Sequence, residues 1–198
     1  MIQKFDDLFQ VPVYRSPVPN WSTTLKSDFL NLVDWNDREC HAGHWFDPVE
    51  SSQDVCAYTD YYKYYDAGVQ PDYFPNLLKI LRQPLQEFQQ LHPGATVDNA
   101  WCQRYTETAC HPAHNHGAIG YSAVFYAQLS SGASPTAFFS PVADPWTGQI
   151  ETIVPPCVEG DIIFFPSYMI HQSLPHRDSI DKVIFSFNLS KSQEQILI

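Results

Sequence analysis

The stretch DIIFFPSYMIHQSLPHRDSIDKVIFSFNLS, residues 161–190, decides the fold. It contains two short runs of aromatic and β-branched residues, DIIFFP and KVIFSFNLS, separated by Pro, Ser and Asp. Runs of this length and composition, bounded by turn-forming residues, are typical of β-strands. Between the two runs stand two histidines, His171 and His176.

Similar runs begin after Thr96 and precede this stretch. They are WCQRYT (101–106), YSAVFYAQL (121–129), TAFFS (136–140) and QIETIV (149–154). Short strands at this spacing predict a sandwich or a small barrel of the jelly-roll type. We therefore expect a mainly β fold with a jelly-roll core over residues 96–198.

Residues 1–95 predict a mixed α/β region. Residues 11–14 suit a short strand, and a helical stretch follows Asn20. The clearest helix is predicted over residues 75–91, where leucines recur at helical spacing, and Pro84 should bend or divide it. We expect its apolar stripe to pack on the sheet, so that N-terminal helices buttress the barrel. No linker is visible, which favours a single domain over 1–198.

Composition narrows the classes of partner. The chain has 198 residues, of which 44% are hydrophobic and 17% charged, as in globular proteins. The net charge is −11 and no Lys/Arg-rich run is present, which disfavours a nucleic-acid partner. No secretory segment is visible, and the longest apolar run is too short to span a bilayer. We expect a cytoplasmic protein without membrane contact, whose five cysteines are free thiols.

A histidine pair in HPAHNHG carries the chemistry. His114 and His116 stand at i and i+2, which share one face of a β-strand. His171 on a later strand would close a three-point site that leaves other metal positions open. The residues therefore predict a metal-dependent β-barrel enzyme. His111 lies three residues before His114 and is not expected among the ligands, and His176, in a polar loop, is expected at the surface.

An ordered series of motifs carries a family resemblance. HPAHNHGAIGYSAVFYAQL, then PPCVEGDIIFFPSYMIHQSLP and KVIFSFNLS, resembles the iron(II)- and 2-oxoglutarate-dependent oxygenases over about residues 99–190. It is most similar to short bacterial and phage members. The resemblance implies a double-stranded β-helix, with Fe(II) at one end and 2-oxoglutarate and O₂ as cosubstrates. It makes His114 and His171 ligands and puts His116 where most members have Asp or Glu.

The resemblance also points to an anchor for 2-oxoglutarate. Lys182 stands where most members place an Arg that binds the distal carboxylate. Strand alternation puts Lys182 on the face opposite Val183 and Phe185, and a lysine inside a barrel needs an anion. Arg177, in the loop before it, is the rival anchor. Gln103 and Tyr105 share a strand face and are expected to hydrogen-bond the cosubstrate; we predict no catalytic residue beyond the metal site.

The function implied by the resemblance is an oxidoreductase. It would couple decarboxylation of 2-oxoglutarate to hydroxylation of a peptidyl residue such as proline, or of a small metabolite. One alternative is a cupin-type three-histidine enzyme without 2-oxoglutarate, since Gly160, Pro166 and His171 also follow a cupin spacing; Tyr121, where that motif has Glu, disfavours it. Another is a non-enzymatic jelly-roll binding module. The Tyr-rich segment 58–65 is either a lid over the barrel mouth or an exposed loop, and the oligomeric state is left open.

Overall fold

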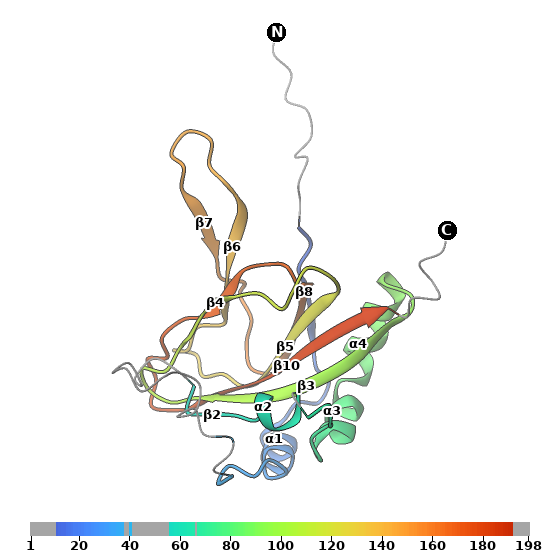
Figure 1. The fold of residues 1–198 in the computed structure, drawn as a ribbon. Helices are drawn as coiled ribbons and strands as arrows, with labels where there is room; N and C mark the ends of the chain where they lie inside the picture. The colour runs from blue at the N-terminus through green and yellow to red at the C-terminus, as the bar shows by residue number, and fades with distance from the viewer. Residues whose placement is uncertain (1–10, 38–39, 41–55, 66, 192–198) are drawn as a thin grey trace.

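The computed structural model describes residues 11–37, 40, 56–65 and 67–191 (Figure 1). Strands predominate and helices are confined to the first half of the chain. The elements in chain order are β1 (Tyr14–Pro17), α1 (Thr23–Leu30), β2 (Tyr58–Thr59), α2 (Tyr61–Tyr64), α3 (Phe74–Ile80), α4 (Arg82–Leu91), β3 (Ala95–Tyr105), β4 (His111–His114), β5 (Tyr121–Gln128), β6 (Thr136–Ala143), β7 (Ile150–Ile153), β8 (Asp161–Pro166), β9 (His171–Ser173) and β10 (Lys182–Lys191).

The strands form two antiparallel sheets that face each other. The larger has six strands in the order β1-β8-β5-β10-β3-β2, and the smaller has four in the order β4-β9-β6-β7. Neighbours are remote in sequence: β10 pairs with both β3 and β5, and β9 pairs with both β4 and β6. This is the double-stranded β-helix of the mainly β class, as the motif series implied.

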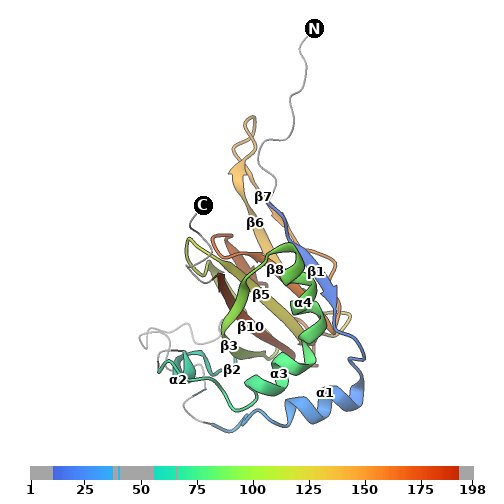
Figure 2. The ribbon, with the colours of Figure 1, turned by 90° about the vertical axis from the view of Figure 1, so that its right-hand side faces the viewer.

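Helices α1, α3 and α4 cover the outer face of the six-stranded sheet (Figure 2). A single apolar cluster joins the two layers, with Phe29, Leu77 and Phe88 from the helices meeting Phe125 and Phe185 from the sheet. The Phe88 ring stacks on Phe164 at 4.4 Å between centroids. The expectation that the N-terminal helices buttress the barrel is confirmed.

Strand β10 shows how alternation separates core from site. Val183, Phe185, Phe187 and Leu189 belong to the cluster under the helices. Ile184 belongs to a second cluster, between the two sheets. Lys182 and Ser186 are buried as well. Since side chains alternate along a strand, these even-numbered residues project into the barrel.

The predicted helix over residues 75–91 is divided, and the break comes before the proline. Helix α3 ends at Ile80, and α4 begins at Arg82. Pro84 has no N–H to donate to residue 80, so an unbroken helix would lose a hydrogen bond there. Restarting the helix at Arg82 places Pro84 in a first turn, where a backbone N–H needs no intrahelical partner.

Two other expectations are corrected. The first strand begins at Tyr14 and runs to Pro17, later than the predicted 11–14. The His-x-His pair does not lie on one strand, because β4 ends at His114 and His116 follows it. Strands β4 and β9, which carry His114 and His171, are 4 and 3 residues long, too short to leave a periodic pattern.

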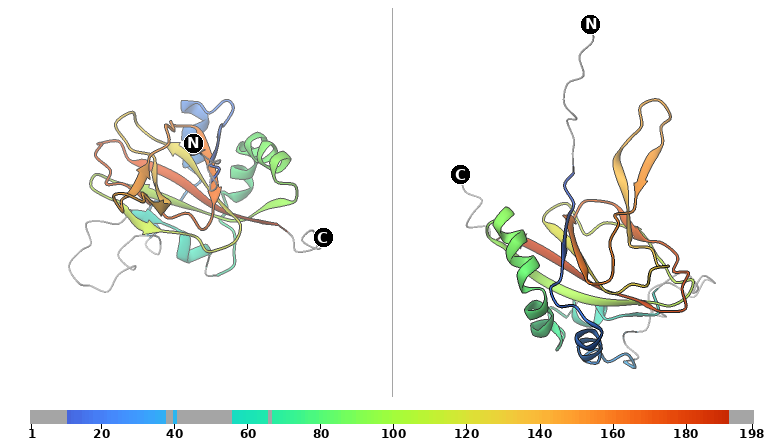
Figure 3. Two further views of the ribbon diagram at one scale, coloured as in Figure 1. Left: turned by 90° about the horizontal axis from the view of Figure 1, so that it is seen from above. Right: turned by 180° about the vertical axis from the view of Figure 1, so that it is seen from behind.

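The β6–β7 hairpin projects from the body of the molecule (Figure 3).

Candidate metal centre

Pairing of two short strands brings His114 and His171 together. The two residues are register partners in the antiparallel β4–β9 pair, and their ring centroids lie 4.4 Å apart. His171 is only 4% exposed. His114 and His171 are remote in sequence. They become neighbours because β4 and β9 are paired in the small sheet.

His116 reaches the same point from the loop after β4. Its backbone N–H donates to the Ser167 carbonyl at 2.9 Å, which ties the loop to the turn before β9. The loop ends at Gly120, whose φ of +92° and position against the Leu189 carbonyl leave no room for a side chain. The His116 ring lies 5.3 Å from His114 and 5.0 Å from His171, centroid to centroid.

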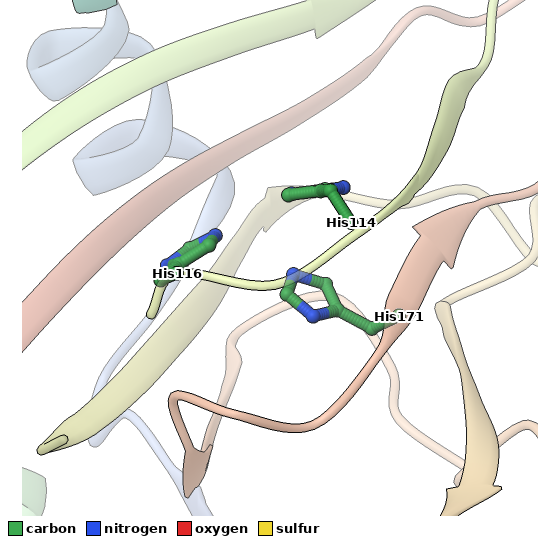
Figure 4. A group of neighbouring side chains, drawn as sticks. All are labelled: His114, His116 and His171. Atoms are coloured by element: carbon green, nitrogen blue, oxygen red, sulfur yellow. The ribbon is translucent and has the colours of Figure 1, made fainter. Parts of the chain in front are cut away.

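The three histidines converge (Figure 4). One ring nitrogen from each lies within 4.8 Å of the other two. Among the described residues, this is the group of three or more potential ligands close enough to share a metal ion. The spacing in sequence predicted this trio, although loop geometry and not strand alternation places His116.

Each histidine has its second ring nitrogen engaged. His114 Nδ1 lies 2.8 Å from the Pro112 carbonyl, and His171 Nδ1 lies 2.9 Å from the Met169 carbonyl. A carbonyl only accepts, so both Nδ1 atoms carry the proton and both Nε2 atoms keep a lone pair. This outer contact is the one that orients metal-ligating histidines in proteins.

His116 is held by side chains instead. Its Nδ1 donates to Asn188 Oδ1 at 2.9 Å and lies 2.8 Å from Ser122 Oγ. Asn188 is itself oriented, since its amide donates to Asn99 Oδ1 at 3.1 Å. The sequence analysis gave Asn188 and Ser122 no role. For Asn188 the signal was present, because it shares the inward face of β10 with Lys182.

The site favours neutral imidazoles. Burial, together with a smaller effect of the neighbouring His114, lowers the pKa of His171 to about 3 and that of His116 to about 4. Burial also lowers the pKa of His114. A neutral imidazole is the form that binds a metal ion, so these rings are ready to act as ligands at neutral pH.

His111 lies closer to the site than its spacing suggested. The β4–β9 register is irregular between His111 and His114. The two rings therefore stack at 4.1 Å between centroids and 23° between planes, despite the three-residue separation. His111 stays outside the group of potential ligands. Its Nδ1 lies 3.2 Å from Gln103 Nε2.

Lys182 points into the barrel, as alternation predicted. It is 1% exposed, and its Nζ donates to the Ser134 carbonyl at 2.8 Å and to Ser173 Oγ at 2.9 Å. The same ammonium lies 5.3 Å from the centre of the Tyr105 ring. Within the part of the chain that is described, no carboxylate forms an ion pair with it. Burial accordingly lowers the pKa of Lys182 to about 7.

Two hollows meet at the histidines. The inner hollow is lined by Gln103, Tyr105, His111, His114, His116, Val124, Thr136, His171, Gln172, Ser173, Ile184 and Ser186. The outer hollow, of about 320 Å³, is lined by Tyr61, Tyr62, Tyr65, Trp101, Gln103, His111, His114, Asn115, His116 and Asn188. Gln103 and three histidines belong to both, so they form the boundary between them.

The Tyr-rich segment borders the outer hollow. The rings of Tyr61 and Tyr65 stack at 4.5 Å between centroids, and Trp101 meets Tyr61 edge-on at 5.0 Å. Tyr62 and Tyr65 are each 41% exposed. The segment lies beside the outer hollow and is partly exposed, and its role as a lid over the barrel mouth stays a prediction.

The structure also places the other residues that the sequence analysis singled out. Gln103 and Tyr105 both line the inner hollow, and their hydrogen bonds to the cosubstrate stay a prediction. Arg177 is exposed. His176 is not at the surface: it is 2% exposed, and its Nε2 donates to the Ile180 carbonyl at 2.8 Å. Its backbone is bonded to Thr108 and Ala109, which draws the polar loop inward.

The cysteines and helices carry simpler findings. None of the five cysteines, all of which lie in the described part of the chain, forms a disulfide, as predicted. Among the described residues, no helix combines the length and the apolar character that crossing a membrane requires.

Comparison with known families gives one match. Residues 99–188 match the family described as "Putative 2OG-Fe(II) oxygenase". These residues include all three converging histidines and Lys182. No curated protein matches the sequence.

Solved structures share the fold at low identity. The non-heme α-ketoglutarate-dependent carbocyclase SnoK from nogalamycin biosynthesis is 9% identical, with a TM-score of 0.63 over 90% of this chain and 79% of its own. The viral collagen prolyl hydroxylase from Paramecium bursaria Chlorella virus-1, in complex with 2OG, is 15% identical, with a TM-score of 0.53 over 91% and 96%. This chain spans 55% of the length of a 2OG-Fe(II) oxygenase family oxidoreductase from Burkholderia pseudomallei, at 13% identity, 60% coverage of this chain and a TM-score of 0.45.

Proposed function

We propose that the chain, whose residues 99–188 match a 2OG-Fe(II) oxygenase family, is an iron(II)- and 2-oxoglutarate-dependent oxygenase that hydroxylates a peptidyl residue, such as proline, or a small metabolite. Members of this superfamily are oxidoreductases that need Fe(II) and 2-oxoglutarate. In the proposed reaction a C–H bond becomes C–OH, and 2-oxoglutarate and O₂ yield succinate and CO₂. The observation that carries the proposal is the convergence of three oriented, neutral histidines beside a buried lysine that lacks an ion-pair partner in the described chain.

The three histidines suit Fe(II). We propose that Nε2 of His114, His116 and His171 hold the metal on one face, since their Nδ1 atoms are already engaged. Imidazole is a ligand of iron, and a three-point facial site leaves positions for cosubstrate and O₂. Bound iron would supply activation of O₂ for C–H oxidation. His116 in place of a carboxylate leaves the donor set without negative charge.

We assign the cosubstrate to the inner hollow, with Lys182 as its distal anchor. The Lys182 ammonium would bind the distal carboxylate as a point charge, without the two-pronged geometry of an Arg. Ser173 Oγ, already bonded to Nζ, lies at the same place. The inner hollow has a volume of about 20 Å³, which is space for roughly one water molecule. Cosubstrate binding therefore requires side chains of its wall, such as Tyr105, to move.

We assign the primary substrate to the outer hollow. At about 320 Å³ it has room for a small molecule or one residue of a peptide. Tyr61, Tyr65 and Trp101 would bind an apolar part of the substrate and exclude water from the histidines behind them.

An anaerobic titration tests the proposal. Apo-protein is given Fe(II), then 2-oxoglutarate, and observed for the weak visible charge-transfer band of a chelated 2-oxo acid. We expect the band, followed by O₂-dependent formation of succinate. A three-histidine enzyme that does not use 2-oxoglutarate would bind Fe(II) without the band. Absence of both the band and succinate would refute the proposed function.

Site variants test the residue assignments. His171→Ala should abolish Fe(II) binding, whereas His92→Ala, which removes a histidine packed among aromatic rings on the outer side of the sheet, should leave it unchanged. Unchanged iron content in His171→Ala would refute the site.

A further inference from the structure

His111 is a half-buried polar side chain at the metal centre that the proposed function leaves without a role. We propose that it is a positioning residue, which holds the His114 ring by stacking and donates a hydrogen bond from Nε2 to the cosubstrate at the metal. This role rests on the proposed function and extends it to a fourth histidine.

The hydrogen-bond network determines the His111 tautomer. The Gln103 side chain presents its amide nitrogen to His111, 3.2 Å from Nδ1, and its Oε1 to Ser186 Oγ at 3.3 Å. An amide nitrogen only donates, so Nδ1 of His111 accepts. A neutral imidazole that accepts at Nδ1 carries its proton on Nε2. His111 is thus opposite in tautomer to His114 and His171, whose Nδ1 atoms donate to carbonyls.

The position of His111 gives that proton a use. The residue lines both the inner and the outer hollow, as do His114 and His116. It lies outside the group of potential ligands, so its Nε2 need not bind metal. A 2-oxo acid bound at the three histidines, where the two hollows meet, would lie beside His111 and would offer it carboxylate oxygens. Hydrogen bonds to charged oxygens are stronger than those between neutral groups.

Stacking gives His111 a second effect on the site. Its ring lies 4.1 Å from His114 with 23° between planes. His114 is otherwise oriented by the Pro112 carbonyl alone among the polar contacts described. The His111 ring, packed on the face of the His114 imidazole, restricts rotation of that imidazole. Contacts of residues around a metal site with its ligands orient the ligands in this way.

Two substitutions separate these effects. His111→Phe keeps a flat ring but removes the donor, whereas His111→Gln keeps an N–H near the same position but removes the ring. Fe(II) affinity and 2-oxoglutarate affinity are measured separately by anaerobic titration, with the charge-transfer band as readout for the second. His92→Phe is the matched control, because it replaces a histidine packed on aromatic rings away from the site.

We expect opposite patterns. His111→Phe should bind Fe(II) within about twofold of wild type but weaken 2-oxoglutarate about tenfold, the effect of one hydrogen bond to a charged group. His111→Gln should bind 2-oxoglutarate with an affinity within about threefold of wild type. Its affinity for Fe(II) should be roughly two- to tenfold weaker than that of wild type, because the ring that stacks on His114 is lost. The control should match wild type in both.

Two results would overturn this role. One is wild-type 2-oxoglutarate affinity in His111→Phe. The other is a proportional loss of Fe(II) and 2-oxoglutarate binding in both variants, which indicates general damage to the fold. A wild-type protein that binds Fe(II) but never shows the band refutes the proposed function and this role with it, so the two failures are distinguishable.

Discussion

Binding of 2-oxoglutarate should weaken steeply above neutral pH, because the anchor we assign, Lys182, loses its proton there. Burial lowers the pKa of Lys182 from 10.5 to about 7 in the free protein. A bound dicarboxylate supplies the missing counter-charge and raises that pKa, so binding takes up a proton. Between pH 7 and pH 9 the protonated fraction of the free protein falls from about one half to about one in a hundred, and Kd should rise about 50-fold.

Few other groups near Lys182 titrate in this range. Burial raises the pKa of Tyr105 well above its usual value, so the phenol stays neutral. Ser173 and the Ser134 carbonyl do not ionise. The metal-site histidines lose their protons well below pH 7. Calorimetry of the Fe(II)-loaded protein under argon, in buffers of different ionisation enthalpy, measures Kd and the number of protons taken up together.

Variants complete the test. Lys182→Arg keeps its charge at every pH, so any remaining affinity should be flat from pH 7 to 9. Lys182→Met should bind weakly at all pH values. A wild-type Kd that stays constant from pH 7 to 9 would refute the reasoning about protonation, and full affinity in Lys182→Met would refute the anchor itself.

The buried Lys182, which we assign to cosubstrate binding, should also lower the stability of the apoprotein at neutral pH. A folded-state pKa below the unfolded value means that the unfolded chain binds more protons, so apoprotein stability should rise between about pH 7 and pH 10. At pH 7 the penalty is about 4 kcal/mol, from roughly three pKa units at 1.36 kcal/mol each. Lys182→Met should therefore unfold at higher urea concentration than wild type, and a lower midpoint would contradict the size of the penalty.

Three further predictions concern single side chains. Asn188→Ala should weaken Fe(II) binding about 10- to 100-fold through loss of the His116 contact, measured by metal titration; unchanged affinity would exclude that contact as an orienting one. Leu77→Ala, at 0% exposure under the sheet, should cost about 2–5 kcal/mol in urea unfolding and leave the Fe(II) affinity of folded protein intact. Burial raises the pKa of Asp60 to about 6, so the free energy of unfolding should fall by about 3 kcal/mol as pH rises from about 4 through 6. Asp60→Asn should flatten this dependence of stability on pH. An equal slope in the variant would exclude Asp60 as its source.

Much of the fold could be predicted because strands carry their own signal. The runs at 121–129, 161–166 and 182–190 correspond to β5, β8 and β10, which are rich in aromatic and aliphatic residues and are largely buried. Strands β4 and β9 could not be predicted this way. They are held by pairing with each other and with β6, which is a property of the assembled sheet.

Some features of the candidate site could likewise be predicted from the sequence, and others could not. The positions of His114, His116 and His171 in the motif series indicated a shared site, and alternation alone turned Lys182 inward. The loop position of His116, the stacking of His111 across an irregular register and the burial of His176 each depend on backbone hydrogen bonds to remote segments. A local pattern contains no information on such contacts.

The sequence by itself determined the class of fold, the trio of histidines and the inward lysine, because each follows from strand periodicity or from residue types in a recognisable order. Only the tertiary structure decided which nitrogen of each ring is available. Pro112 and Met169 carbonyls take the Nδ1 protons of two histidines, and Asn188, 72 residues away in the chain, takes that of the third. The tautomer of an imidazole is set by the acceptor beside it. Two of these acceptors are carbonyls two residues earlier in the chain, and the third, Asn188, reaches His116 only when β10 has joined the sheet.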